Sequence, residues 1–119
     1  MNTKLRYLLY DWGVPPHVKG FRYIASAVEI ALEDPEAFDM MIKAFYPKIA
    51  RIHNTTPSRV ERAIRHAKEL SLYNMSPEQL QNYFGRTISC GGAVPNSLYL
   101  TALTQTYEEL ISNEENKNG

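Results

Sequence analysis

Three arginines recur at three-residue intervals between residues 57 and 70, and their side chains could read DNA bases. They are Arg59, Arg62 and Arg65. A guanidinium group can donate two parallel hydrogen bonds to the O6 and N7 atoms of guanine. Glu61, in the same segment, carries a carboxylate that can accept from the N4 amino group of cytosine or orient a neighbouring arginine. Arg62 lies nearest the centre of this polar face, so it is the first choice for a base contact.

A predicted helix that begins directly after a polar turn positions these side chains. Thr56 suits the N-cap, because its hydroxyl can accept from an early N–H, and Pro57 suits the first helical position. Apolar residues at helical spacing define the inner face: Val60, Ala63, Ile64, Ala67 and Leu70. The outer face carries Ser58, Arg59, Arg62, Arg65, His66 and Glu69. The small side chains of Ala63 and Ala67 should let this helix approach a neighbour closely.

A shorter helix is predicted just before the turn, because Tyr46, Ile49 and Ala50 recur at helical spacing. Two helices joined by a short turn predict a helix-turn-helix over about residues 47–73, with the second helix as the reader of the major groove. From this pattern alone, an ordinary helical hairpin with a solvated arginine face is an equal alternative.

Phosphate contacts are expected from the turn and from the helix before it. Short polar side chains and free N–H groups at a turn can dock on the DNA backbone. The candidates are Lys48, Asn54, Thr55 and Thr56.

The charge of the chain is zero in total but unevenly distributed. Residues 43–69 carry seven Lys/Arg and two Glu, a net charge of +5, whereas residues 1–42 and 70–119 have net charges of −2 and −3. A local basic surface attracts a polyanion. Acidic flanks should weaken non-specific DNA binding, so that specific contacts decide the site.

Other kinds of chemistry find little support in the sequence. The spacing of His17, His53 and His66 matches no zinc pattern. Cys90 is the only cysteine, which excludes an internal disulfide. Gly91 and Gly92 follow it without the Lys-Ser/Thr of a phosphate-binding loop. We therefore predict no catalytic residue, no metal site and no cofactor, and we predict that the protein is not an enzyme.

Length and composition favour one all-α domain. A chain of 119 residues, 44% of them hydrophobic, can build one modest core. No apolar run approaches a membrane span and no signal peptide is apparent, so a cytoplasmic location without membrane contact is predicted. We expect a compact domain of about six helices over residues 1–112 and a frayed polar tail over residues 113–119.

The apolar spacing also predicts the remaining helices. They are expected over about residues 5–12, 21–32, 38–45, 77–85 and 97–111. The third of these carries Phe38, Met41, Ile42 and Phe45 at helical spacing and should end near Pro47. Ser76 and Gln79 form a predicted capping box, Gly85 should close that helix, and residues 86–95 should form a loop. On the last helix, Tyr99 and Tyr107 are expected to be exposed.

Three stretches of the sequence are long and irregular: Asn-Thr-Thr-Pro-Ser-Arg-Val-Glu-Arg-Ala-Ile-Arg-His-Ala at 54–67, Gly-Val-Pro-Pro-His-Val-Lys-Gly-Phe at 13–21 and Tyr-Pro-Lys-Ile-Ala at 46–50. They resemble the C-terminal DNA-binding effector domain of the stage-zero sporulation protein A family. These are the master sporulation response regulators of endospore-forming bacteria, which act in two-component systems. The resemblance extends over about residues 5–111.

The resemblance implies sequence-specific binding of double-stranded DNA, with the reading helix in the major groove of a TGTCGAA-like box. The base-reading positions it implies here are Ser58, Arg59, Glu61, Arg62, Arg65 and His66. It also implies a second copy on tandem boxes and contact with RNA polymerase. Pro57 departs from the alanine common in the family, and the residues around Cys90 lack the family's lysine.

A second class of function stays open at this point. The chain could be a helical interaction module that does not bind DNA and pairs with a full-length regulator or with RNA polymerase. Full-length members of the family carry an N-terminal phospho-accepting receiver domain. An excised fragment and a stand-alone paralogue would both read like this sequence.

Overall fold

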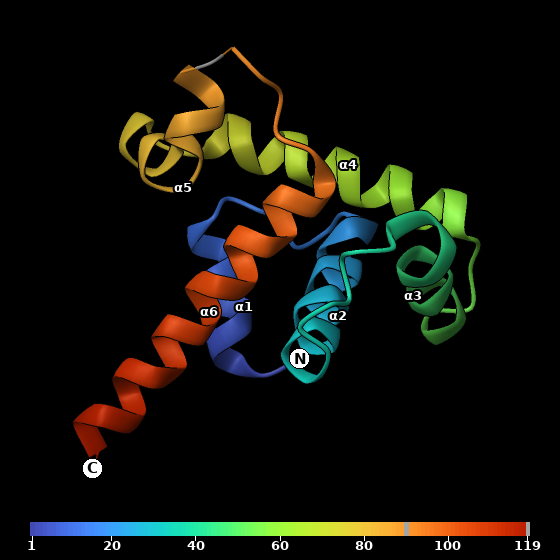
Figure 1. Cartoon of the computed structure of the whole chain (residues 1–119), viewed down its shortest axis with the longest axis horizontal. Helices are drawn as coiled ribbons and strands as arrows, with labels where there is room; N and C mark the ends of the chain where they lie inside the picture. The colour runs from blue at the N-terminus through green and yellow to red at the C-terminus, as the bar shows by residue number, and fades with distance from the viewer. Residues whose placement is uncertain (90, 119) are drawn as a thin grey trace.

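The computed structural model describes residues 1–89 and 91–118, and within these ranges every regular element is a helix (Figure 1). The α-helices are α1 (Thr3–Asp11), α2 (Lys19–Glu33), α3 (Tyr46–Ile52), α4 (Pro57–Asn74), α5 (Pro77–Ser89) and α6 (Asn96–Asn118). A π-helical segment, η1 (Met41–Phe45), directly precedes α3. The predicted all-α fold of about six helices is confirmed.

The first two helices form where the apolar spacing predicts them. Asn2 caps α1, because its side-chain oxygen accepts from the backbone N–H of Leu5 at 2.8 Å. The apolar face of α1 and the adjoining Trp12 are buried in the core. Helix α2 buries one side along most of its length, so it lies at the centre of the domain.

Helices α2 and α4 approach each other closely at Gly20. A Cβ atom at this position would lie only 2.2 Å from the carbonyl oxygen of Ala63 and 2.7 Å from Cβ of Ala67. The small residues of α4 therefore do permit a close approach, as the sequence indicates. The neighbour they meet at this point is α2, far away in the sequence.

The predicted third helix is wrong in its extent, and of its four apolar residues only Phe45 is fully buried. Residues 35–40 form turns, and η1 continues into α3 without a break at Pro47, which lies in the first turn of α3. Proline is tolerated there because the N–H groups of a first helical turn lack helical partners. The wider π turn shifts the side chains around the axis, and Ile42 is 81% exposed while Phe45 is buried.

Helix α5 starts as predicted but ends later. Ser76 and Gln79 form a reciprocal capping box, with N–H···O distances of 3.0 and 3.1 Å. Gly85 does not end the helix, which continues to Ser89, so the predicted loop from residue 86 is shorter than expected. The prediction for Cys90 lies outside the described residues.

Helix α6 also extends beyond the sequence prediction. It runs to Asn118, whereas a frayed tail was expected from residue 113. Lys4 of α1 forms an ion pair with Glu114 in this part of α6.

The expected exposure of Tyr99 and Tyr107 is wrong, because both side chains are buried, at 0% and 3% exposure. The hydroxyl of Tyr99 donates to Oγ of Ser71 at 2.7 Å, and Ser71 donates in turn to the backbone oxygen of Trp12 at 2.6 Å. Burial raises the pKa of Tyr99 above its ordinary value. The hydroxyl of Tyr107 accepts from Nδ2 of Asn2 at 2.6 Å. Each phenol has a polar partner, which offsets the cost of burying it.

Candidate nucleic-acid interface

The turn between α3 and α4 is fixed by its own hydrogen bonds. Asn54 has a φ of 53°, in the left-handed region that asparagine tolerates better than most residues. The N–H of Thr55 donates to the carbonyl of Ala50 at 2.9 Å, which closes the end of α3. Thr56 is the N-cap of α4, as predicted, and its hydroxyl accepts from the N–H of Arg59 at 3.3 Å. The geometry of the two helices and their turn is compatible with the predicted helix-turn-helix.

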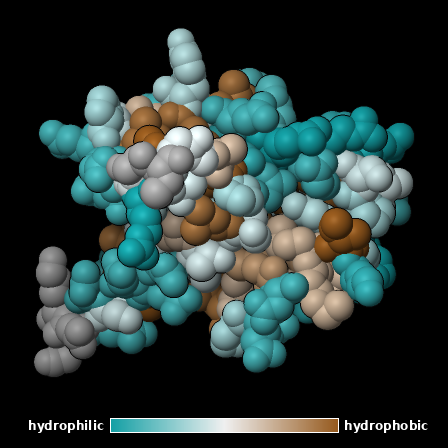
Figure 2. All heavy atoms as spheres, turned by 45° about the horizontal axis from the view of Figure 1, so that its top comes forward, coloured by the Kyte–Doolittle hydropathy of each residue, from teal (hydrophilic) through white to brown (hydrophobic). Residues whose placement is uncertain are grey.

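Helix α4 separates an apolar inner face from a charged outer face. Val60, Ile64 and Ala67 are each 0% exposed, and the inner face continues into Ser71. The outer positions named from the sequence are all exposed: Ser58, Arg59, Arg62, Arg65, His66 and Glu69. Figure 2 turns the α4 side of the molecule toward the viewer and shows mainly hydrophilic side chains in its upper right part. Burial of the inner face therefore holds the arginines outward.

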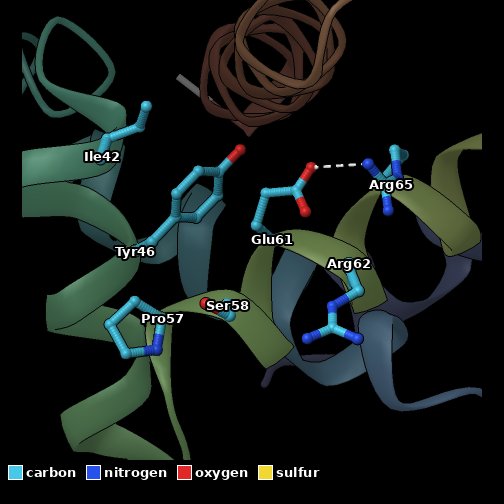
Figure 3. A pocket seen from close by; sticks show the side chains of 7 residues that line it. All are labelled: Ile42, Tyr46, Pro57, Ser58, Glu61, Arg62 and Arg65. Carbon is cyan, nitrogen blue, oxygen red and sulfur yellow. Dashed lines mark ion pairs between the residues drawn. The ribbon is translucent and has the colours of Figure 1, made fainter.

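A shallow pocket of about 410 Å³ lies along one side of this outer face (Figure 3). Its residues come from η1, the start of α3 and the first half of α4: Ile42, Tyr46, Pro57, Ser58, Glu61, Arg62 and Arg65. Five of these seven, from Pro57 to Arg65, lie on α4 itself. The exposed Ile42 gives the pocket an apolar edge that the sequence did not predict.

The arginines of α4 are held differently. Arg65 Nη1 lies 3.3 Å from Glu61 Oε1, so this pair, one helical turn apart, restrains the Arg65 side chain. Figure 3 shows the Arg62 side chain pointing away from this pair. Among the described residues, neither Arg59 nor Arg62 forms an ion pair. Arg62 can therefore approach a ligand without first leaving a carboxylate.

Tyr46 connects the pocket to the start of α6. Its buried hydroxyl accepts from Nδ2 of Asn96 at 2.9 Å. Burial raises the pKa of Tyr46 above its ordinary value, so the phenol stays neutral beside Glu61 and Arg65. The hydrogen bond links α3 to the first residue of α6 and fixes this wall of the pocket.

The four residues predicted to contact phosphates lie in α3 and in the turn that follows it. Lys48, Asn54 and Thr56 are exposed, and Thr55 is half-buried. Thr55 also lines a small pocket, with Lys19, Tyr23, Arg59 and Arg62.

His53, at the end of α3, anchors the turn to α2. Its Nε2 and the hydroxyl oxygen of Ser26 lie 2.7 Å apart in a hydrogen bond. Its ring packs edge-on against Tyr23, with a centroid distance of 4.9 Å. Burial lowers the pKa of His53 below its ordinary value; the positive charge of Arg22 lowers it further, and Glu29 partly opposes both.

Lys19 was not predicted to belong to this surface, but the structure places it beside α4. It lines a second small pocket with Tyr23, Thr55, Arg59 and Arg62. Residues 1–42 are acidic in total, so a count of charge along the sequence gave no sign that one of their lysines belongs to a basic surface. Such a count does not show that the start of α2 lies beside the start of α4. The motif at residues 13–21, which includes Lys19, was the signal that could have drawn attention to it.

Within residues 1–89 and 91–118, no group of three or more metal-binding side chains comes together. His17, His53 and His66 therefore do not meet. No helix in the same ranges combines the length and apolar character required to cross a bilayer.

An all-helical domain with an arginine-rich outer face on a helix that follows a short turn belongs to a class of folds that often bind DNA. The family model described as "Sporulation initiation factor Spo0A C terminal" matches residues 5–107. The chain belongs to this family. The family consists of DNA-binding effector domains of sporulation response regulators, and it is a family of transcription regulators rather than of enzymes.

Proposed function

We propose that this chain binds a TGTCGAA-like DNA box sequence-specifically, with α4 in the major groove. The observation that carries the proposal is the division of α4 into a fully buried apolar face and an exposed face with Arg59, Arg62 and Arg65. A B-DNA major groove admits one α-helix, and arginine pairs best with guanine there. A box with G·C pairs at its centre suits this set of side chains.

The base-reading roles follow from position and pairing. Arg62, exposed and without a carboxylate partner in the described part of the chain, is the first candidate for a bidentate guanine contact. Arg65 is restrained by Glu61, so the two can act together, the carboxylate orienting the arginine or accepting from cytosine. The other candidate readers are Ser58 and Arg59, near the start of α4, and His66.

The phosphate contacts proposed are Lys48, Asn54, Thr55 and Thr56. Such contacts would fix the register of α4 on the duplex without reading its sequence. The helix-turn-helix would then comprise about residues 47–73 within an effector domain of residues 1–112.

The partners proposed beyond DNA are a second copy of this chain on tandem boxes and RNA polymerase. A DNA-bound role would keep the protein in the cytoplasm and away from membranes. The competing function is an interaction module that does not bind DNA.

The deciding experiment measures binding to a duplex with the TGTCGAA-like box and to a scrambled duplex of equal composition, at one stated salt concentration. We expect clearly tighter binding to the box, by at least about tenfold. Equal affinity for both duplexes, or no binding to either, would favour the interaction module.

A further inference from the structure

A second pocket lies beside the first turn of α4 and differs in composition from the one in Figure 3. Its volume is about 280 Å³, and its lining consists of Lys19, Tyr23, Thr55, Arg59 and Arg62. Three of the five side chains are cationic, and no carboxylate lines the pocket. Uncompensated cations in one concave site repel one another and favour an anion.

The cations come from two helices that are fixed relative to each other. Gly20, the residue after Lys19, lies so close to the Ala63 carbonyl that no Cβ would fit between them. The start of α2 is therefore held against the first half of α4. Lys19 is also the first residue of the fifteen-residue helix α2, whose partial positive charge adds to that of the side chains.

The third wall of the pocket is fixed as well. The hydrogen bond between His53 and Ser26, together with the edge-on packing of His53 on Tyr23, holds the turn against α2. Thr55 follows in the turn, and its N–H already donates to the carbonyl of Ala50. Its hydroxyl is left as the group that can donate into the pocket.

We propose that Lys19 and Thr55, with Arg59 beside them, bind one phosphodiester group of the DNA strand that flanks the box. This rests on the proposed function. Arg62 lines both this pocket and the pocket in Figure 3, so the site is continuous with the base-reading face. A strand that follows α4 along the groove therefore passes over it, and Lys19 adds a DNA contact from outside the helix-turn-helix.

The first test compares Lys19→Gln with Lys4→Gln, a matched loss of one positive charge. Lys4 is paired with Glu114 near the far end of α6, away from α4 (Figure 1). We expect Lys19→Gln to weaken binding roughly three- to tenfold for both the box and the scrambled duplex. The salt slope of log K should become less steep by about 0.9, the value for one phosphate. Lys4→Gln should leave the slope unchanged, and Lys19→Arg should restore binding.

The second test removes the charge from single phosphates of the duplex. A neutral methylphosphonate is placed in turn at each linkage on both flanks of the box. At one linkage, the substitution should weaken binding of the wild-type protein and have no further effect on Lys19→Gln. If every neutral linkage weakens binding of the wild type and of Lys19→Gln by the same factor, the two changes act independently and the proposal is wrong.

A third test distinguishes a site for a DNA phosphate from a site for free inorganic phosphate. Wild-type protein and Lys19→Gln are titrated with inorganic phosphate by calorimetry. If inorganic phosphate binds the wild type alone while both proteins bind DNA equally, the pocket is a site for small anions and the proposal is wrong. Thr55→Val, which keeps the shape of the side chain, should reproduce part of the DNA-binding loss.

Failure of this proposal can be told apart from failure of the proposed function. If the wild-type protein prefers the box but Lys19→Gln binds with unchanged affinity and salt slope, only the phosphate site is wrong. If the wild-type protein has no preference for the box, the sequence-specific function itself is wrong.

Discussion

Arg62 and Lys48 are both exposed cations, but they should affect DNA binding in different ways. Arg62→Ala removes a proposed bidentate base contact, so it should cost about 1–3 kcal/mol and relax the preference at one base pair. Lys48→Ala removes a proposed phosphate contact, so it should weaken binding about equally for all sequences and lower the salt slope by about one. The measurement is the affinity of each variant for the box and for a set of single-base variants.

Both side chains are exposed, so both variants should remain folded, and circular dichroism provides the control. If Arg62→Ala keeps full discrimination between matched and mismatched boxes, Arg62 is not the reader. Arg59 or the restrained Arg65 would then take that role.

His53 should make the stability of the domain depend on pH. Its pKa is lowered in the folded protein, so the folded state binds this proton less readily than the unfolded state does. The contribution of His53 to stability is complete above the ordinary histidine pKa of about 6.5. It is lost as the pH falls through the lowered pKa of the folded state.

The measurement is the free energy of unfolding in urea at several pH values between about 7.5 and 5.5, for the wild type and His53→Gln. Glutamine can still bond with the Ser26 hydroxyl but does not titrate. The wild type should lose more stability than the variant over this range. Parallel curves would show that the environment of His53 does not favour its neutral form.

The contact between α2 and α4 depends on the absence of a side chain at Gly20. Gly20→Ala places a methyl group against the Ala63 backbone, which cannot move aside, so we expect a loss of about 1–3 kcal/mol. Gly85→Ala is the matched control within α5. There the added methyl meets only the side chain of Gln81, an exposed residue that can swing into solvent.

Relief of the helix penalty of glycine should make Gly85→Ala neutral or more stable by about 0.5–1 kcal/mol. The unfolding curve of Gly20→Ala should therefore shift to lower stability. The curve of Gly85→Ala should shift to higher stability or stay where the wild-type curve lies. Similar destabilisation by both substitutions would mean that the contact at Gly20 is not special.

The faces of α4 could be predicted from the sequence, because each depends only on spacing along one helix. Val60, Ile64 and Ala67 are buried as that spacing requires. The partner of Ala67 could not be predicted, since local spacing does not say which helix supplies the opposing surface. The exposure of Ile42 depends on a π-helical turn, which the regular helical period does not describe.

The candidate site was predicted only in the part that is continuous in sequence. Residues 48–66 follow one another through α3, the turn and α4, so one motif contains them. Lys19 enters the same surface only because Gly20 allows α2 to contact α4. Tyr99 was misjudged for a related reason, since its partner Ser71 comes from a different helix.

The molecule as a whole separates its charges. Eight of the thirteen Lys/Arg residues lie on α3, α4 and the first turn of α2, while α6 carries four glutamates and one lysine. Figure 1 shows α6 running away from α4 toward the C-terminus. The basic side of the domain attracts an approaching duplex and the acidic side repels it. Encounters in which α4 faces the DNA are therefore favoured.

This separation determines how binding should respond to salt. Of the seven Lys/Arg residues between Lys43 and Lys68, Lys68 is largely buried, and its pKa is lowered by burial. Arg65 is paired with Glu61, so not every charge in the segment can neutralise a phosphate.

If about four phosphates are neutralised, log K should fall against log salt concentration with a slope of about −3.6. The measurement is the affinity for the box at several salt concentrations with the scrambled duplex as control. A slope near zero would mean that no phosphates are neutralised, and the charge separation would then serve a partner other than DNA.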